Sequence, residues 1–214
     1  ENVKDMGLEG MSFDIVYGGG RITATIPSPG IHMVMNSLCA AAVGLTLGIE
    51  PELIKRGIES YAPVEGRMQI IKTQRLTLLD DSFNANPTSM AAAINIACRA
   101  SGRTVLILGD MLELGEKGAE YHRNMGKKAA ECGADIMIGK GPLMKNACEE
   151  TERAGIETMH FDTSEDIMRA LDNCLRDGDT VLVKASHGTN LKDVAEYIKA
   201  NFYQDRTGLS PTLR

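Results

Sequence analysis

Residues 76–110 read LTLLDDSFNANPTSMAAAINIACRASGRTVLILGD, and this stretch decides the fold class. Two apolar runs, at residues 76–79 and 105–108, enclose a segment at 88–99 whose apolar residues have the spacing of a helix. A helix between two strands carries the chain back to the end of the sheet where the first strand began, so the two strands run parallel. The stretch therefore predicts a strand–helix–strand unit of a parallel sheet.

The same alternation continues along the chain after residue 67. We expect strands at residues 135–138, 157–161 and 180–183, and helices at 116–131, 142–153, 164–175 and 190–201. Ser164 is the expected N-cap of its helix, with Glu165 and Asp166 in the first turn. This order predicts an α/β fold, a Rossmann-like and mostly parallel sheet with helices on both faces. The helix at 190–201 carries one apolar stripe, made of Leu191, Val194, Ala195, Ile198 and Phe202.

The first third of the chain has a different pattern. Residues 12–17 and 21–26 alternate in polarity around three glycines at 18–20, which predicts a β-hairpin. A helix is expected after Gly30 and a shorter one from Pro51, a favourable first helical residue. We place a domain boundary at 61–66, giving a domain portion at 1–65, the sheet domain at 66–204 and an irregular tail at 205–214. The apolar face of the first helix is expected to comprise Val34, Leu38, Ala41, Ala42 and Leu45.

The composition excludes several classes of protein. Of 214 residues, 43% are hydrophobic and 24% charged, which is typical of a globular chain. Apolar runs are too short for a membrane span, and a net charge of −6 without tryptophan argues against nucleic-acid binding. The spacing of the four histidines predicts no metal site. The five cysteines lack a Cys-x-x-Cys pair and are expected to be reduced core thiols of a cytoplasmic protein: Cys39, Cys98, Cys132, Cys148 and Cys174.

The chain also lacks two familiar catalytic signals. It contains no Gly-x-x-x-x-Gly-Lys-[Ser/Thr] phosphate loop and no Gly-x-Ser-x-Gly nucleophile elbow. It begins at Glu1 without an initiator methionine, so we expect a fragment of a longer protein.

Polar residues follow the ends of the predicted strands, where open α/β sheets bind their ligands. Of Asp80 and Asp81, one is expected to serve as a turn group and the other to face the ligand. Carboxylates, amides and cations at one edge suit a polar, anionic ligand that carries amide groups. The residues concerned are Asp81, Asn84, Asn86, Asp110, Lys140, Asp162, Lys184, Ser186 and His187.

Residues 80–90, DDSFNANPTSM, resemble the motif that opens the third domain of the Mur ligases, the ATP-dependent amide ligases of cell-wall peptidoglycan synthesis. Four further stretches resemble family motifs in the same order: PGIHMVMN at 29–36, GRMQ at 66–69, LGDMLELG at 108–115 and VLVKASHG at 181–188. The resemblance thus extends over most of the chain. It implies that residues 1–65 are the end of the central ATP-binding domain and that 66–204 are the C-terminal domain.

The resemblance implies a bacterial cytoplasmic enzyme that adds D-alanyl-D-alanine to UDP-N-acetylmuramoyl-tripeptide through an acyl phosphate. ATP and Mg²⁺ would serve the full-length enzyme, whose catalytic residues are expected upstream of Glu1, so this chain alone is expected to be inactive and to hold no metal. Two alternatives stay open: another ligase of the Mur or folylpolyglutamate type, and a ligand-binding domain without catalysis. The sequence LGDMLELG argues against the other ligases.

By the same resemblance, nine residues receive roles. Three positions depart from the family pattern: Met33 replaces an asparagine, Phe83 a tyrosine and His187 an arginine. The charge at position 187 consequently depends on pH. His32 lies in the first motif, where a helix cap or a packing role is as much expected as ligand contact. The residues expected to bind ATP are Asn36, Arg67, Asp81, Asn84 and Asn86, and those expected to bind substrate are Lys184, Ser186, His187 and Asp110.

Overall fold

The computed structural model describes residues 1–202 and contains two compact units. The N-terminal unit comprises Glu1–Pro63, and the sheet unit begins at Val64. The expected tail at 205–214 lies outside the described residues.

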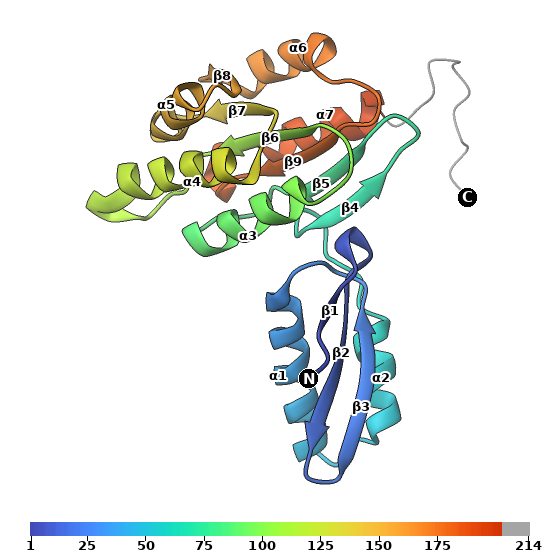
Figure 1. The fold of residues 1–214 in the computed structure, drawn as a ribbon. Helices are drawn as coiled ribbons and strands as arrows, with labels where there is room; N and C mark the ends of the chain where they lie inside the picture. Colours follow the sequence, from blue (N-terminus) through green and yellow to red (C-terminus); the bar gives the residue numbers. More distant parts are fainter. Residues whose placement is uncertain (203–214) are drawn as a thin grey trace. The chain divides into compact units, whose positions relative to one another are not determined.

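The N-terminal unit is built on an antiparallel sheet in the order β1-β2-β3 (Figure 1). Strands β2 (Met11–Tyr17) and β3 (Gly20–Ile26) form the predicted hairpin, with Tyr17 opposite Gly20 at the turn. Strand β1 (Lys4–Asp5), which precedes a 3-10 turn at Gly7–Glu9, was not predicted, because two residues are too few to show an alternation.

Two helices pack against this sheet, α1 (Ile31–Thr46) and α2 (Pro51–Glu59), and the second begins at the predicted proline. The predicted apolar face of α1 is partly wrong: Val34 and Ala41 are buried, but Ala42 is exposed. The buried stripe instead includes Ser37 and Gly44. Ser37 tolerates burial because its hydroxyl donates to the carbonyl of Met33 at 2.8 Å, which satisfies its polar group.

A charged cluster joins the hairpin strands to the chain terminus. The Asp14 carboxylate accepts hydrogen bonds from Thr23 (2.7 Å), Asn2 (2.7 Å) and Arg21 (2.6 Å). These bonds favour the charged carboxylate, the Thr23 hydroxyl most, and lower the pKa of Asp14 to about 2.

The titration of Asp14 gives a test of this cluster. Because its pKa is lowered, its stabilising contribution is present above the ordinary value of 3.8 and is lost as the pH falls toward about 2. We expect the carboxyl carbon of Asp14, followed by NMR, to titrate with a midpoint well below the ordinary aspartate value of 3.8. A midpoint at the ordinary value would contradict the cluster.

The sheet unit contains six strands in the order β4-β5-β9-β6-β7-β8. All neighbouring pairs are parallel except β4 (Gln69–Lys72), which runs antiparallel to β5. Strand β4 was not predicted, because its short sequence of mixed polarity lies at the edge and is at most half-buried. The five predicted strands are present as β5 (Thr77–Asp81), β6 (Thr104–Gly109), β7 (Ile136–Lys140), β8 (Glu157–Phe161) and β9 (Thr180–Lys184).

Helices cover both faces of this sheet, as predicted (Figure 1). On one face lie α3 (Pro87–Cys98), α4 (Gly118–Cys132) and α5 (Lys145–Arg153). On the other lie α6 (Ser164–Cys174) and α7 (Lys192–Phe202). The predicted stripe of α7 is confirmed, because all five of its apolar residues are buried in the core between the sheet and these two helices.

The predicted cap of α6 is wrong by one residue. Thr163 is the N-cap, and its hydroxyl accepts from the backbone N–H of Asp166 at 3.2 Å. Ser164 is the first helical residue and is buried, with its hydroxyl donating to the carbonyl of Asn190 at 3.0 Å. Two adjacent hydroxyl residues fit the capping pattern equally well in sequence, and burial of Ser164 decides between them.

Candidate functional site

An ion pair lies at the carboxyl ends of the adjacent strands β5 and β9. Parallel register places Asp81 opposite Lys184, and the Lys184 Nζ lies 2.6 Å from the Asp81 Oδ2. The same ammonium donates to the carbonyl of Asn84 at 2.8 Å. The Lys184 side chain is 2% exposed and that of Asp81 is 16% exposed, so the pair is largely shielded from water.

Both oxygens of Asp81 are engaged by the protein. Oδ2 accepts from Lys184, and Oδ1 accepts from the backbone N–H of Met68 at 3.0 Å. Burial raises the pKa of Asp81, and the Lys184 ammonium opposes that shift. These hydrogen bonds connect three segments at one point: strand β9, the loop after β5 and the segment before β4.

Asp80 serves the turn, as expected for one residue of the pair. It is 1% exposed and accepts from the backbone N–H and the hydroxyl of Ser82, at 3.2 and 2.6 Å. Its other oxygen lies 2.7 Å from the Lys199 Nζ of α7. Alternation along the strand separates the two carboxylates, because consecutive residues point to opposite faces of a sheet.

Three exposed side chains, one aromatic and two basic, lie on the segments just before β4, after β5 and after β9. The Arg67 guanidinium carbon is 4.0 Å from the centre of the Phe83 ring, which is a cation–π distance. The His187 ring centre is 5.6 Å from that of Phe83, with the planes tilted by 43°. All three residues are exposed, and Phe83 retains 43% of its surface. We call Arg67, Phe83 and His187 the cation–aromatic cluster.

Gly66 sets the position of this cluster. Its carbonyl accepts from the backbone N–H of Phe83 at 2.9 Å, and its φ of +70° lies in the left-handed region. A side chain at Gly66 would also lie 3.2 Å from the Phe83 nitrogen. Glycine is therefore required for Arg67 to approach Phe83 so closely.

The two asparagines of the loop after β5 have different local roles. Asn86 caps α3, because its side chain accepts from the Ser89 backbone N–H at 2.8 Å while the Ser89 hydroxyl accepts from the Asn86 N–H. The Asn84 oxygen accepts from the N–H of Ala85 at 2.9 Å. Both residues are exposed, so their side-chain amides still face solvent.

Ser186 and Asp110 are internal, unlike the exposed His187. The Ser186 hydroxyl accepts from the Leu112 N–H at 2.9 Å and donates to the Ala85 carbonyl at 3.3 Å. Asp110 accepts from the backbone N–H groups of Leu143 and Met144, at 3.3 and 2.7 Å. Asp110 thereby satisfies two N–H groups just before α5, which begins at Lys145 and not at the predicted residue 142.

His122, one of the four histidines whose spacing predicts no metal site, orders the loop after β6. Its ring is fully buried; Nε2 accepts from the Met111 N–H at 2.9 Å and Nδ1 lies 2.6 Å from the carbonyl of Gly118. A carbonyl accepts only, so Nδ1 carries the proton and the imidazole is neutral. The sequence holds one signal for this structural role, namely that the histidine follows the LGDMLELG stretch by seven residues.

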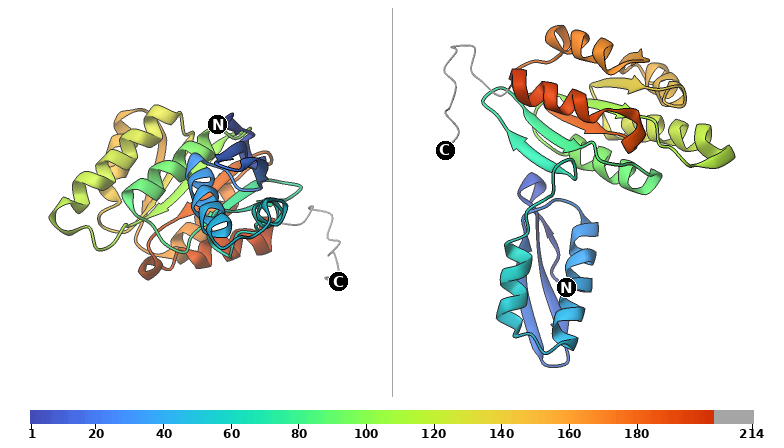
Figure 2. Two further views of the ribbon diagram at one scale, coloured as in Figure 1. Left: turned by 90° about the horizontal axis from the view of Figure 1, so that it is seen from below. Right: turned by 180° about the vertical axis from the view of Figure 1, so that it is seen from behind.

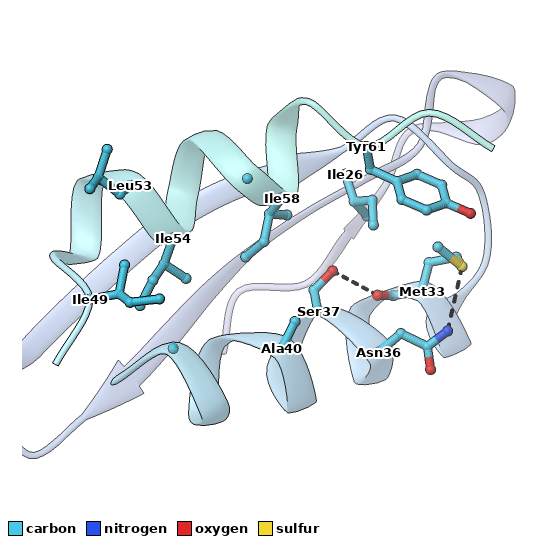
Figure 3. A pocket seen from close by; sticks show the side chains of 12 residues that line it. Ile26, Met33, Asn36, Ser37, Ala40, Ile49, Leu53, Ile54, Ile58 and Tyr61 are labelled. Carbon is cyan, nitrogen blue, oxygen red and sulfur yellow. Dashed lines mark hydrogen bonds between the residues drawn. The ribbon is translucent and has the colours of Figure 1, made fainter. Parts of the chain in front are cut away.

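Asn36 belongs to the N-terminal unit. It lies on α1 at a pocket of 480 Å³ between α1 and α2, where its side-chain amide donates to the sulfur of Met33 at 3.7 Å (Figure 3). Apart from Asn36 and Ser37, the lining is apolar or aromatic, including Ile54, Ile58 and Tyr61. His32, also on α1, is exposed.

Most charged side chains at this edge of the sheet form hydrogen bonds or ion pairs with other groups of the protein. Lys140, which follows β7, donates to the Ser164 hydroxyl at 2.8 Å and to the carbonyl of Thr189 at 2.5 Å. Among residues 1–202, no three histidine, cysteine, aspartate or glutamate side chains are grouped as metal ligands would be. Over the same residues, no helix has the length and apolar character that crossing a membrane requires.

Fold and edge together define an α/β domain of the doubly wound class, with a polar, cationic carboxyl edge. The family model described as "Mur ligase, glutamate ligase domain" matches residues 66–187, more than half of the chain. The chain therefore belongs to the Mur ligase family, which confirms the resemblance drawn from its motifs.

Individual relatives agree with this assignment. The UDP-N-acetylmuramoyl-tripeptide–D-alanyl-D-alanine ligase of Buchnera aphidicola is 32% identical over 199 residues, covering 92% of this chain and 42% of that protein. A crystal structure of MurF from Acinetobacter baumannii matches with a TM-score of 0.83 and 26% identity, over 92% of this chain and 44% of that one. MurF from Thermotoga maritima, solved in complex with ADP, shows the same fold at 22% identity and a TM-score of 0.75, over 92% of this chain and 45% of that one. The chain spans about two fifths of the length of the relatives it matches.

Proposed function

We propose that the complete protein is an ATP-dependent ligase that adds D-alanyl-D-alanine to UDP-N-acetylmuramoyl-tripeptide in peptidoglycan synthesis. The observation that carries this proposal is the 32% identity to a ligase of that name over 92% of the chain. Residues 1–65 would be the end of the ATP-binding domain and residues 66–204 the C-terminal domain. Because ATP and a nucleotide-linked sugar are cytoplasmic metabolites, the proposed reaction belongs in the cytoplasm.

The reaction proceeds in two displacements. The terminal carboxylate of the tripeptide attacks the γ-phosphorus of ATP, giving an acyl phosphate and ADP. The amine of D-alanyl-D-alanine then attacks the acyl carbon and expels phosphate, losing a proton as the amide forms. Orientation of the reactants and compensation of their negative charge are the tasks left to the protein.

We assign nucleotide contact to residues that remain exposed. The Arg67 guanidinium presents donors for phosphate or ribose oxygens, and Phe83 offers a ring face beside it. Asn84 and Asn86 have exposed amides on the adjoining loop, and Asn36 would contribute from the N-terminal unit. Asp81 has a positioning role, since its two oxygens already bond to Lys184 and Met68.

The residues assigned to the substrate also comprise one that is exposed and others that are internal. His187 is exposed and adds a second basic group beside Phe83, where a carboxylate of the dipeptide would be attracted. Lys184, Ser186 and Asp110 act indirectly, because each bonds to backbone groups of the loops that form the edge. The carboxylates of Asp80, Asp81 and Asp110 already bond to lysine, hydroxyl or backbone N–H groups of the protein, so they do not fit a magnesium site. We therefore assign Mg²⁺ binding to residues outside this chain.

A coupled assay of the full-length enzyme tests the function. We expect ADP release only when ATP, the UDP-linked tripeptide and D-alanyl-D-alanine are all present, with the pentapeptide product identified by mass spectrometry. Release with L-alanine, D-glutamate, diaminopimelate or lysine as the added amino acid, and not with the dipeptide, would favour another Mur-type ligase. Release with a folate acceptor and glutamate would favour a folylpolyglutamate-type ligase. Tight ligand binding without any ADP release would favour a non-catalytic domain.

Substitution of Arg67 tests the nucleotide assignment. In the full-length enzyme, Arg67→Ala is expected to lower kcat/KM for ATP by one to two decades, since a charge-assisted hydrogen bond is worth about 1.5–3 kcal/mol. Stability should change little, because Arg67 is exposed and an exposed cation–π contact contributes about 0.5–1 kcal/mol. Steady-state kinetics with varied ATP provide the measurement.

Arg169→Ala is the matched control for this variant. Arg169 lies on α6 with a side chain that is 76% exposed. Among residues 1–202 it pairs with nearby Asp166 and with the backbone of its own helix. Its removal should leave kcat/KM for ATP unchanged. If the Arg67 variant behaves like the Arg169 variant, Arg67 does not contact the nucleotide.

A further inference from the structure

Two cysteines lie close to each other at the ends of neighbouring helices. Cys98 is the last residue of α3 and Cys132 the last residue of α4, and these helices pack side by side on one face of the sheet (Figures 1 and 2). Although 34 residues separate the two cysteines in the sequence, the packing of α3 against α4 brings these helix ends together. Cys39 is exposed, so the expectation of a core thiol is wrong at that position.

A polar side chain adjoins the pair. The Cys132 thiol also donates to the Asn95 side-chain oxygen at 3.1 Å, and Asn95 lies one helical turn before Cys98. Both cysteines are partly exposed, so small molecules in solution have access to them. Cys148 is buried on α5, and Cys174 lies at the end of α6 on the opposite face of the sheet.

The surroundings of Cys98 disfavour its thiolate form. Burial raises the pKa of Cys98 to about 12, and the neighbouring Cys132 and Asp135 add to this shift while Lys128 opposes it. Cys98 therefore remains a protonated thiol at neutral pH and is a poor first nucleophile. Because Cys98 lies close to Cys132, it is suited to attack an already oxidised Cys132, a step in which proximity compensates for a poor nucleophile.

We propose that Cys98 and Cys132 form a reversible, peroxide-oxidised dithiol. In the first step the Cys132 sulfur attacks one oxygen of a peroxide such as H₂O₂, the O–O bond breaks, and a sulfenic acid and one water form. In the second step the Cys98 sulfur displaces the hydroxyl from the Cys132 sulfur, forming an S–S bond and a second water. Two thiols lose two hydrogens and two electrons in total, and the peroxide is reduced to two waters. A small dithiol reductant reverses the change by thiol–disulfide exchange.

The disulfide is tested by oxidation of the full chain in a Cys39→Ser background. This background removes the exposed thiol of α1, which would otherwise link two molecules. After treatment with dilute H₂O₂, we expect an intact mass lower by two hydrogens. Non-reducing digestion should yield one cross-linked peptide pair containing Cys98 and Cys132, and dithiothreitol should restore the original mass. An unchanged mass, or a cross-link between other cysteines, would overturn the proposal.

Single variants test the order of the two steps. With Cys98→Ser, the sulfenic acid has no partner, so dimedone, which traps sulfenic acids, should label Cys132. With Cys132→Ser, neither the cross-link nor dimedone labelling of Cys98 should form. Labelling of Cys98 in that variant would overturn the assigned order. Cys148→Ser is the matched control and should retain the disulfide; circular dichroism of each variant establishes that it is folded.

Discussion

Lys184→Ala is expected to lower the free energy of unfolding by about 3–5 kcal/mol, because it leaves a buried carboxylate without its cation. Lys184 is 1% exposed, and its ammonium bonds to Asp81 and to the carbonyl of Asn84. Removing the side chain also leaves that carbonyl without its donor. Urea denaturation at pH 7, followed by circular dichroism, measures the change.

Lys192→Ala provides the control for charge and length. Lys192 pairs with Glu65 at 3.1 Å in the same unit, but the two side chains are 59% and 57% exposed. An exposed pair contributes about 0–1 kcal/mol, so this variant should stay close to the parent protein. The double variant Asp81→Asn/Lys184→Met should recover part of the loss, since neither side chain then carries a charge. Equal losses in the two lysine variants would refute the buried pair as a stabilising element.

The same ion pair limits how Asp81 can be studied. Asp81→Ala would leave the Lys184 ammonium buried without its counter-ion, so lost activity in that variant would report unfolding as well as chemistry. Arg67 is exposed, so a variant at this position separates an effect on nucleotide binding from an effect on stability.

Gly126→Ala is expected to destabilise the sheet unit by roughly 1–3 kcal/mol, although alanine is the better helix former. Gly126 lies within α4, where a Cβ atom would be 2.3 Å from the carbonyl oxygen and 2.8 Å from the Cα of Ala147 on α5. Those are backbone atoms of a packed helix, so they cannot rotate away as a side chain does. Thermal or urea unfolding of the variant measures the effect.

Gly57→Ala is the matched control, with the opposite sign. Gly57 lies within α2 and is exposed. Apart from its chain neighbours and the nearby backbone of its own helix, no atom of residues 1–202 lies within 4 Å of where a Cβ would be placed. Replacing such a glycine should stabilise its helix by about 0.5–1 kcal/mol. If both alanine variants raised stability, the close approach of α4 to α5 would be wrong.

Elements with a strong local pattern were predictable from the sequence. The strands β6 and β9 are continuous apolar runs, and α7 shows a single apolar stripe, so their type follows from periodicity. Strand β4 has no such signal, because an edge strand gains its order from pairing with β5, which is a tertiary effect. The cap of α6 depended in the same way on which of two hydroxyl residues is buried.

The edge of the sheet was predictable in position but not in detail. Motif order placed Asp81, Lys184 and Ser186 at strand ends, and the structure brings these ends together. The motif does not specify which groups point outward. Lys184 and Asp110 bond to the protein, whereas His187 and Arg67 remain exposed. This division depends on contacts between segments 100 or more residues apart for Lys184 and 34 residues apart for Asp110.

Strand β9 follows the other five strands of its sheet in the sequence but lies between β5 and β6. During synthesis, β4-β5 and β6-β7-β8 are therefore made as two separate patches with facing unpaired borders, and the sheet closes only when β9 is inserted. Contacts of such long sequence separation form late and slow the search for the native state. A nascent chain halted before residue 180 would expose two adhesive strand borders and lack the Asp81–Lys184 bond altogether, so premature termination should yield aggregating species rather than a smaller working domain.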